Sequence, residues 1–78
     1  MEYDTIEYWK KEIENKNLEI EIYTNAMVNI AKQAEPKFTL IEIVGEKIGD
    51  CKRNLDYYKS RLIEKMQEAT KKEVADDN

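Results

Sequence analysis

The sequence predicts an all-α fold: a long antiparallel hairpin of two helices that spans residues 1–78 as a single domain. Apolar residues recur at alternating steps of three and four along two segments, and the chain's one proline, Pro36, lies between them. A seam that repeats every seven residues keeps one face of a helix against a partner helix, so the two segments are expected to pack on each other in a coiled-coil-like manner.

The first helix is expected over about residues 5–34. Asp4 and Glu7 have the spacing of a capping box, in which a cap side chain and a glutamate three residues later satisfy free amide groups. Pro36 disfavours helical geometry at the residue before it and therefore ends the helix. The seam of this segment consists of Ile6, Trp9, Ile13, Lys16, Ile20, Tyr23, Met27, Ile30 and Ala34.

The second helix is expected over about residues 39–73, followed by a frayed tail at about 75–78. Thr39 and Glu42 repeat the capping-box spacing, which predicts Thr39 as the N-cap. The seam of this segment consists of Ile41, Val44, Ile48, Cys51, Leu55, Tyr58, Leu62, Lys65 and Ala69.

Residues 17–24 carry a competing signal for a short strand. Leu18, Ile20 and Ile22 alternate with glutamates, which is the periodicity of a β-strand. Because the seven-residue pattern continues through this segment without a break, and no glycine or proline flanks it, we predict a continuous helix.

The length of the connection predicts the register between the helices. A turn around Pro36 is expected to place Met27 opposite Ile48, and Trp9 opposite Met66. The same register would bring acidic residues of the first helix beside basic residues of the second, namely Glu12, Glu14, Glu19 and Glu21 beside Lys52, Arg53, Lys59, Arg61 and Lys65.

Composition narrows the class of protein. Thirteen basic and 17 acidic residues are interspersed and leave a net charge of −4, which argues against a double-stranded nucleic-acid binder. No apolar run approaches the roughly 20 residues of a membrane span. One cysteine and no histidine exclude an internal disulfide and an ordinary zinc site, so we expect no metal, no cofactor and a cytoplasmic location. The heavy use of Asn, Lys, Glu and Ile is compatible with a phage or a low-GC bacterium.

Nothing in the sequence indicates catalysis. Without histidine, proton transfer would depend on carboxylates, lysines or tyrosines, and these need burial to shift their pKa values. We therefore predict no catalytic residues and expect the protein not to be an enzyme.

Several apolar and small residues lie outside the seams and suggest self-association. A lone hairpin of 78 residues buries little surface, and a second hairpin could complete a helical bundle. The residues expected at such an interface between copies are Leu18, Ile22, Gly45, Gly49 and Tyr57.

Aromatic residues lie beside basic ones in two short segments. Stacking faces next to cations can hold a nucleotide-like ligand, and the candidate residues are Tyr8, Lys11, Tyr57, Tyr58 and Arg61. The alternative interpretation is that these aromatic residues line the seam and that their basic neighbours form a solvated helix face.

These observations favour a small binding protein, a self-associating hairpin that acts as a regulator or inhibitor by occupying or sequestering a protein partner. An oligomer that binds a nucleotide-like ligand is the first alternative. A structural assembly or adaptor coiled coil is the second.

Overall fold

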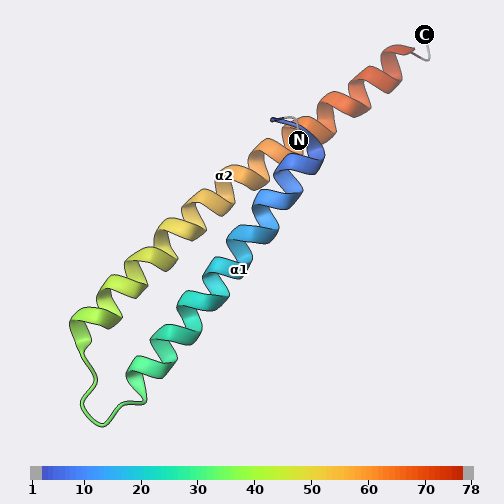
Figure 1. The fold of residues 1–78 in the computed structure, drawn as a ribbon. Coiled ribbons are helices and arrows are strands. Elements are labelled where there is room, and N and C mark those ends of the chain that lie inside the picture. The colour runs from blue at the N-terminus through green and yellow to red at the C-terminus, as the bar shows by residue number, and fades with distance from the viewer. Residues whose placement is uncertain (1–2, 77–78) are drawn as a thin grey trace.

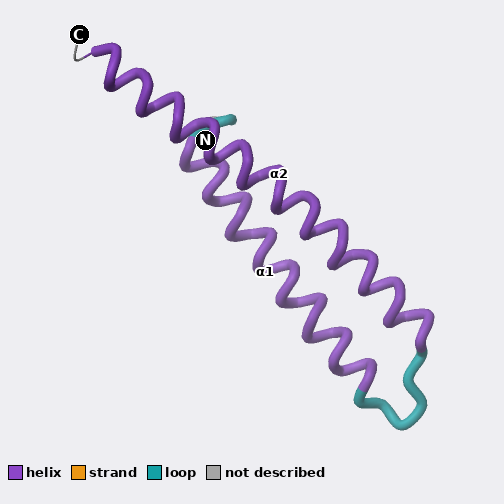
Figure 2. Tube along the Cα trace, turned by 180° about the vertical axis from the view of Figure 1, so that it is seen from behind, coloured by secondary structure: helices purple, strands orange, loops and turns teal. Residues whose placement is uncertain are grey.

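The protein is a hairpin of two antiparallel helices (Figures 1 and 2). The computed structural model describes residues 3–76, with the side chains of residues 3–71. Helix α1 spans Ile6–Ala31 and α2 spans Phe38–Asp76, and residues 32–37 join them. The molecule measures 67 × 18 × 16 Å, and no strand occurs in the described part of the chain. The predicted all-α hairpin and the continuous helix through residues 17–24 are therefore confirmed.

The predicted seams form the contact between the helices. Every seam residue of α1, and every seam residue of α2 as far as Lys65, is buried or half-buried. Trp9, Cys51 and Leu55 are the buried hydrophobic residues of the described chain. Ala69 is exposed because α2, with 39 residues, extends past the start of α1, which has 26.

Helix α1 begins with a different cap from the one predicted. Thr5 is the N-cap, and its hydroxyl accepts a hydrogen bond from the amide of Tyr8 at 3.1 Å. Asp4 precedes the cap in the left-handed region (φ 60°), a conformation that Asp tolerates better than most residues. The predicted Asp4–Glu7 capping box was wrong because the Asp4 carboxylate accepts hydrogen bonds from side chains instead.

Helix α1 ends at Ala31, three residues before the predicted end. The amide of Gln33 donates to the carbonyl of Ile30 at 3.2 Å, which is the tighter pattern of a 3₁₀ turn. Pro36 has no amide N–H to donate a helical hydrogen bond, so α1 ends before it is reached. Ala34, predicted to belong to the seam, lies exposed in the connection.

The start and end of α2 also differ from the prediction. The carbonyl of Lys37 accepts hydrogen bonds from the amides of Leu40 (3.0 Å) and Ile41 (3.2 Å), so the helix starts at Phe38. Thr39 is thus inside the first turn and is not the N-cap. At the other end, helix continues through Asp76, where a frayed tail was predicted from residue 75, and residues 77–78 lie outside the described part.

These caps lead to a prediction about two threonines. Thr5→Ala should lower the free energy of unfolding by about 1 kcal/mol, because it removes a side chain that caps an amide group. Thr39→Ala should change it by less than about 0.5 kcal/mol, since no cap is lost. Urea denaturation followed by circular dichroism measures both, and an equal loss in the two variants would contradict the assignment of Thr5 as the cap.

The register between the helices differs from the prediction by one to two helical turns. Trp9 packs on Tyr57 and Tyr58, whereas Met66 was predicted opposite it. Since α1 stops at Ala31, the midpoint of the connection lies nearer the N-terminus, and each residue of α1 meets an earlier residue of α2. The predicted ion pairs of Glu12, Glu14, Glu19 and Glu21 with the basic residues of α2 do not form among the described residues.

Candidate interaction surfaces

Five aromatic rings pack together where the start of α1 meets the middle of α2, and we call this group the aromatic clasp. Trp9 is its centre, with ring centroids 4.8 Å from Tyr8, 6.0 Å from Tyr57 and 5.6 Å from Tyr58. Tyr3 completes it at 5.4 Å from Tyr8. Most of these pairs have edge-to-face geometry, the arrangement that aromatic quadrupoles favour. The clasp therefore joins the two helices through ring contacts.

Asp4 ties the clasp to the basic residues of α2. Its carboxylate accepts a hydrogen bond from the indole N–H of Trp9 at 2.8 Å. Arg61 Nη2 lies 2.7 Å and Lys65 Nζ 2.9 Å from the carboxylate oxygens of Asp4. The guanidinium of Arg61 also lies over the Trp9 ring, 5.9 Å from its centroid. One carboxylate thus holds a residue of α1 and two residues of α2.

These contacts shift the pKa values of the groups involved. The hydrogen bond from Lys65, followed by those from Trp9 and Arg61, lowers the pKa of Asp4 far below its ordinary value. The same carboxylate raises the pKa of Lys65 and of Arg61. Desolvation is the main cause that raises the pKa of the Tyr8 phenol, and neighbouring Glu12 adds to it. Asp4, Lys65 and Arg61 are therefore stabilised in their charged forms, and Tyr8 in its neutral form.

The structure brings together four of the five residues predicted to bind a ligand. Tyr8, Tyr57 and Tyr58 belong to the clasp, and Arg61 lies over its Trp9 ring. Lys11 forms no ion pair or cation–π contact with a described residue. Arg61 and Lys65 both form ion pairs with Asp4. In addition, Arg61 pairs with Glu64 and Lys65 with Glu68. Sequence reasoning missed Asp4, and its capping-box spacing with Glu7 pointed to another role.

A second polar contact lies at the middle of the hairpin. Lys16, a seam residue only 18% exposed, forms an ion pair with Glu19 at 2.6 Å. The hydrogen bond that Lys16 donates to Glu19 lowers the pKa of Glu19 and raises the pKa of Lys16. The thiol of Cys51 lies 3.8 Å from the Glu19 carboxylate, which places Glu19 of α1 level with Cys51 of α2.

The five residues predicted at an interface between copies lie on three separate surfaces. Leu18 and Ile22 are 51% and 65% exposed, and they point away from α2 because each lies about half a turn from the seam residue Ile20. Tyr57 belongs to the aromatic clasp. Gly45 and Gly49 lie on α2, so one neighbouring copy cannot cover all five at once.

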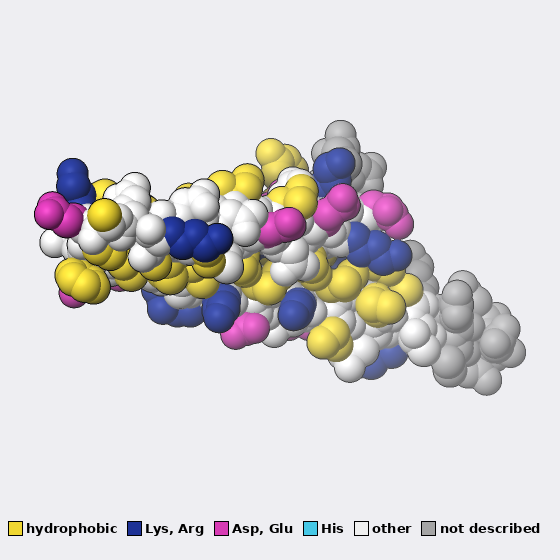
Figure 3. All heavy atoms as spheres, turned by 90° about the horizontal axis from the view of Figure 1, so that it is seen from below, with side chains coloured by type: hydrophobic (Ala, Val, Ile, Leu, Met, Phe, Trp, Pro, Cys, Tyr) yellow, Lys and Arg dark blue, Asp and Glu magenta, His cyan; other side chains and the backbone are white. Residues whose placement is uncertain are grey.

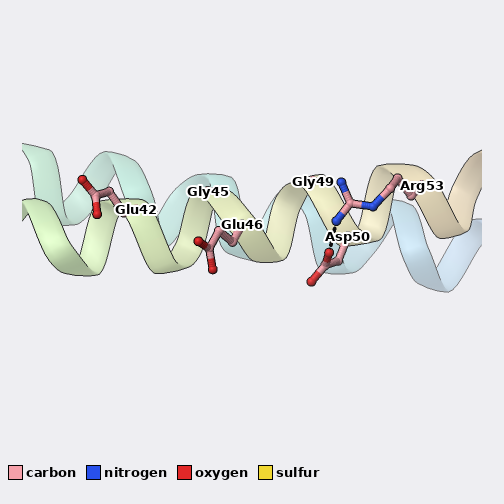
Figure 4. A pocket seen from close by; sticks show the side chains of 6 residues that line it. All are labelled: Glu42, Gly45, Glu46, Gly49, Asp50 and Arg53. Carbon is pink, nitrogen blue, oxygen red and sulfur yellow. Dashed lines mark hydrogen bonds and ion pairs between the residues drawn. The ribbon is translucent and has the colours of Figure 1, made fainter.

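Gly45 and Gly49 form a bare strip of helix surface (Figure 4). The side chains of Glu42, Glu46 and Asp50 project from α2 on the side away from α1, and Arg53 turns back to pair with Asp50. With no side chain on either glycine, a hollow of about 610 Å³ opens between these residues. A Cβ at Gly45 would lie 3.4 Å from the methyl group of Met27, an ordinary van der Waals distance, so a small side chain could be accommodated there.

The part of α2 that extends past α1 carries a second hollow. It has a volume of about 510 Å³, and its lining residues are Ile63, Met66, Gln67, Thr70 and Lys71. Ile63 is 55% and Met66 49% exposed, since no residue of α1 covers this side of α2. Each of the two hollows is lined by a single helix.

No family model, curated protein or solved structure matches this chain. Within the described residues, no helix is long and apolar enough to cross a membrane, and no group of three or more potential metal-binding side chains occurs.

Proposed function

We propose that the protein is a small non-enzymatic binding protein of the cytoplasm, a hairpin that self-associates and acts by occupying or sequestering a protein partner. The observation that carries this proposal is the imbalance between buried and exposed apolar residues. Three hydrophobic residues are buried among the described ones, whereas ten large hydrophobic side chains are more than two-fifths exposed. Figure 3 shows hydrophobic side chains spread over this face of the described part of the hairpin.

Surface of this kind is characteristic of a protein that binds others. Contiguous apolar patches on a soluble protein mark interaction sites, while scattered single residues do not. Leu18 and Ile22 are four residues apart on the outer face of α1, which is the spacing of anchors that a helix inserts into an apolar groove. Apart from Tyr8, every described ionisable group with a shifted pKa is part of an ion pair. This supports a structural role for these groups.

A matched pair of variants tests the partner surface on α1. Ile22→Glu should reduce capture of the partner from cells of the native host by at least about tenfold, because it places a charge in the apolar contact. Asn29→Glu adds the same charge one heptad further along the helix and should leave capture unchanged. Quantitative pull-down measures both, and equal capture by Ile22→Glu and the unchanged protein would remove this surface from the proposal.

A nucleotide-like ligand at the aromatic clasp is the second candidate, favoured by Tyr57, a residue that is 58% exposed and lies near Arg61. A ligand that binds only the folded state must raise the melting temperature. Thermal-shift assays with nucleotides therefore separate the candidates: a shift that Tyr57→Ala abolishes would favour the ligand, and the absence of any shift would favour the protein partner.

A further inference from the structure

Three hydrogen-bond donors converge on the carboxylate of Asp4. The indole N–H of Trp9 and Nη2 of Arg61 donate to its Oδ1 at 2.8 and 2.7 Å, and Nζ of Lys65 lies 2.9 Å from its Oδ2. Both oxygens are therefore held, two of the donors carry a positive charge, and the donors come from both helices. Charge-assisted hydrogen bonds of this kind are how proteins bind carboxylates and phosphates. The three side chains thus form an oxyanion site, and the chain's own Asp4 fills it.

The donors are held in place by contacts other than those with Asp4. Trp9 is buried among the rings of the clasp, and the guanidinium of Arg61 lies over its ring. Each of the two cations also pairs with an exposed glutamate three residues further along α2, namely Glu64 and Glu68. With both glutamates in place, the pKa of Asp4 is still far below its ordinary value, so the position favours a negative charge. The donors would therefore keep their arrangement if Asp4 withdrew.

Asp4 can leave this site without loss of helix α1. It lies outside the helix, which begins at Ile6, and the next residue, Thr5, makes the N-cap hydrogen bond. The backbone of Asp4 is in the left-handed region at φ 60°, which residues other than glycine rarely adopt. A rotation of this one residue to an ordinary backbone conformation would relieve that strain and move the carboxylate away from the donors.

We propose that Asp4 is an internal occupant of this site, and that an external oxyanion, the phosphate or carboxylate group of a ligand, displaces it and binds Trp9, Arg61 and Lys65. Tyr57 is 58% exposed and in ring contact with Trp9, so it offers a stacking surface beside the bound group. The inference deepens the second candidate function, since a nucleotide-like ligand would bring both a phosphate and a ring, and it rests on that candidate for the ring alone.

The internal carboxylate determines how tightly a free anion binds. Asp4 is tethered one residue before the cap of α1, and a group on so short a tether competes at an effective concentration of millimolar or more. A small anion with no other contact therefore binds the unchanged protein weakly. A ligand that also stacks on Tyr57 gains the additional contact needed to displace Asp4. Asp4 thus excludes isolated anions from the site and selects for larger ligands.

Removal of the carboxylate from the full-length protein tests the proposal. Asp4→Gly deletes it and keeps the left-handed backbone accessible, because glycine adopts positive φ without steric cost. Inorganic phosphate at about 50 mM and constant ionic strength should raise the melting temperature of Asp4→Gly by at least about 4 °C, and that of the unchanged protein by less than about 1 °C. Acetate is measured in parallel, and the stronger response identifies the preferred group as a phosphate or a carboxylate.

Two control variants locate the response. Asp4→Gly combined with Arg61→Gln and Lys65→Gln lacks both cations of the site and should lose the response. Asp50→Ala frees a single arginine, Arg53, from its ion pair on the outer side of α2, and it should respond no more than the unchanged protein.

Circular dichroism at one fixed protein concentration follows the melting. If Asp4→Gly is unfolded without an anion, phosphate or acetate should restore its helical signal, and no recovery would overturn the proposal. Equal responses of Asp4→Gly and the unchanged protein, or a response that survives the loss of both cations, would overturn it as well. Adenosine monophosphate separates the two proposals. If it stabilises Asp4→Gly no more than phosphate does, the nucleotide candidate fails and the oxyanion site stands. A nucleotide shift in the unchanged protein, with no anion response in Asp4→Gly, would overturn the oxyanion site alone.

Discussion

Trp9→Ala is expected to lower the free energy of unfolding by about 3–5 kcal/mol, the range observed when a buried aromatic residue is truncated. Trp9 is one of three buried hydrophobic residues in the described chain, and it touches rings on both helices. Its loss also removes the indole N–H that donates a hydrogen bond to Asp4. A domain of 78 residues has a total stability on the order of 4–12 kcal/mol, so the variant should be largely unfolded on warming.

Thermal and urea denaturation at one fixed protein concentration measure the effect, because the stability of an oligomer depends on concentration. Trp9→Phe keeps a ring but removes the N–H donor, and it should lose less stability than Trp9→Ala. Ile22→Ala, at a side chain 65% exposed, should change stability by no more than about 0.5 kcal/mol. Similar losses in Ile22→Ala and Trp9→Ala would contradict the position of Trp9 at the centre of the contact.

The second large effect is expected at Asp4 and should depend on pH. Because the folded-state pKa of Asp4 is lowered, its charge contributes stability above the unfolded-state pKa of about 3.9, and this contribution is lost as pH falls toward the folded-state value. Asp4→Asn should therefore melt at a lower temperature than the unchanged protein at pH 7. The difference should shrink as the pH is lowered from about 5 to about 2.

Alkaline pH should lower stability through Lys65, the basic partner of Asp4 in the same ion pair. The pKa of Lys65 is raised, so its contribution is complete below the unfolded-state value of about 10.4 and is lost as pH rises through the folded-state pKa. Glu42→Gln removes an exposed carboxylate outside the clasp and serves as the matched control. A difference between Asp4→Asn and the unchanged protein that stays constant from pH 7 to pH 2 would show that the charge of Asp4 does not hold the helices together.

The seam was predictable from the sequence because it depends only on the spacing of apolar residues, which the helical repeat converts into a face. The register was not, since it depends on where α1 stops. The hydrogen bond from the Gln33 amide to the Ile30 carbonyl, which ends α1, forms only in the folded connection. As a result Trp9 packs on Tyr57, about two turns before the residue that the sequence predicted opposite it.

The aromatic clasp was predictable only in part. Adjacent aromatic and basic residues pointed to Tyr8, Tyr57, Tyr58 and Arg61, which the fold brings together. The role of Asp4 was not predictable. From the sequence alone, an aspartate next to a helix start is expected to cap the backbone amides, and only the folded structure brings distant side-chain donors to it. Arg61, 57 residues away in sequence, reaches Asp4 only in the folded register.

Sedimentation equilibrium of the unchanged full-length protein, over concentrations from roughly 1 to 100 µM, tests the central claim of self-association most directly. Many dimers of standard interface size form within this range of dissociation constants. We predict an average mass that rises with concentration toward twice 9.3 kDa. A single species of 9.3 kDa at every concentration would contradict the account.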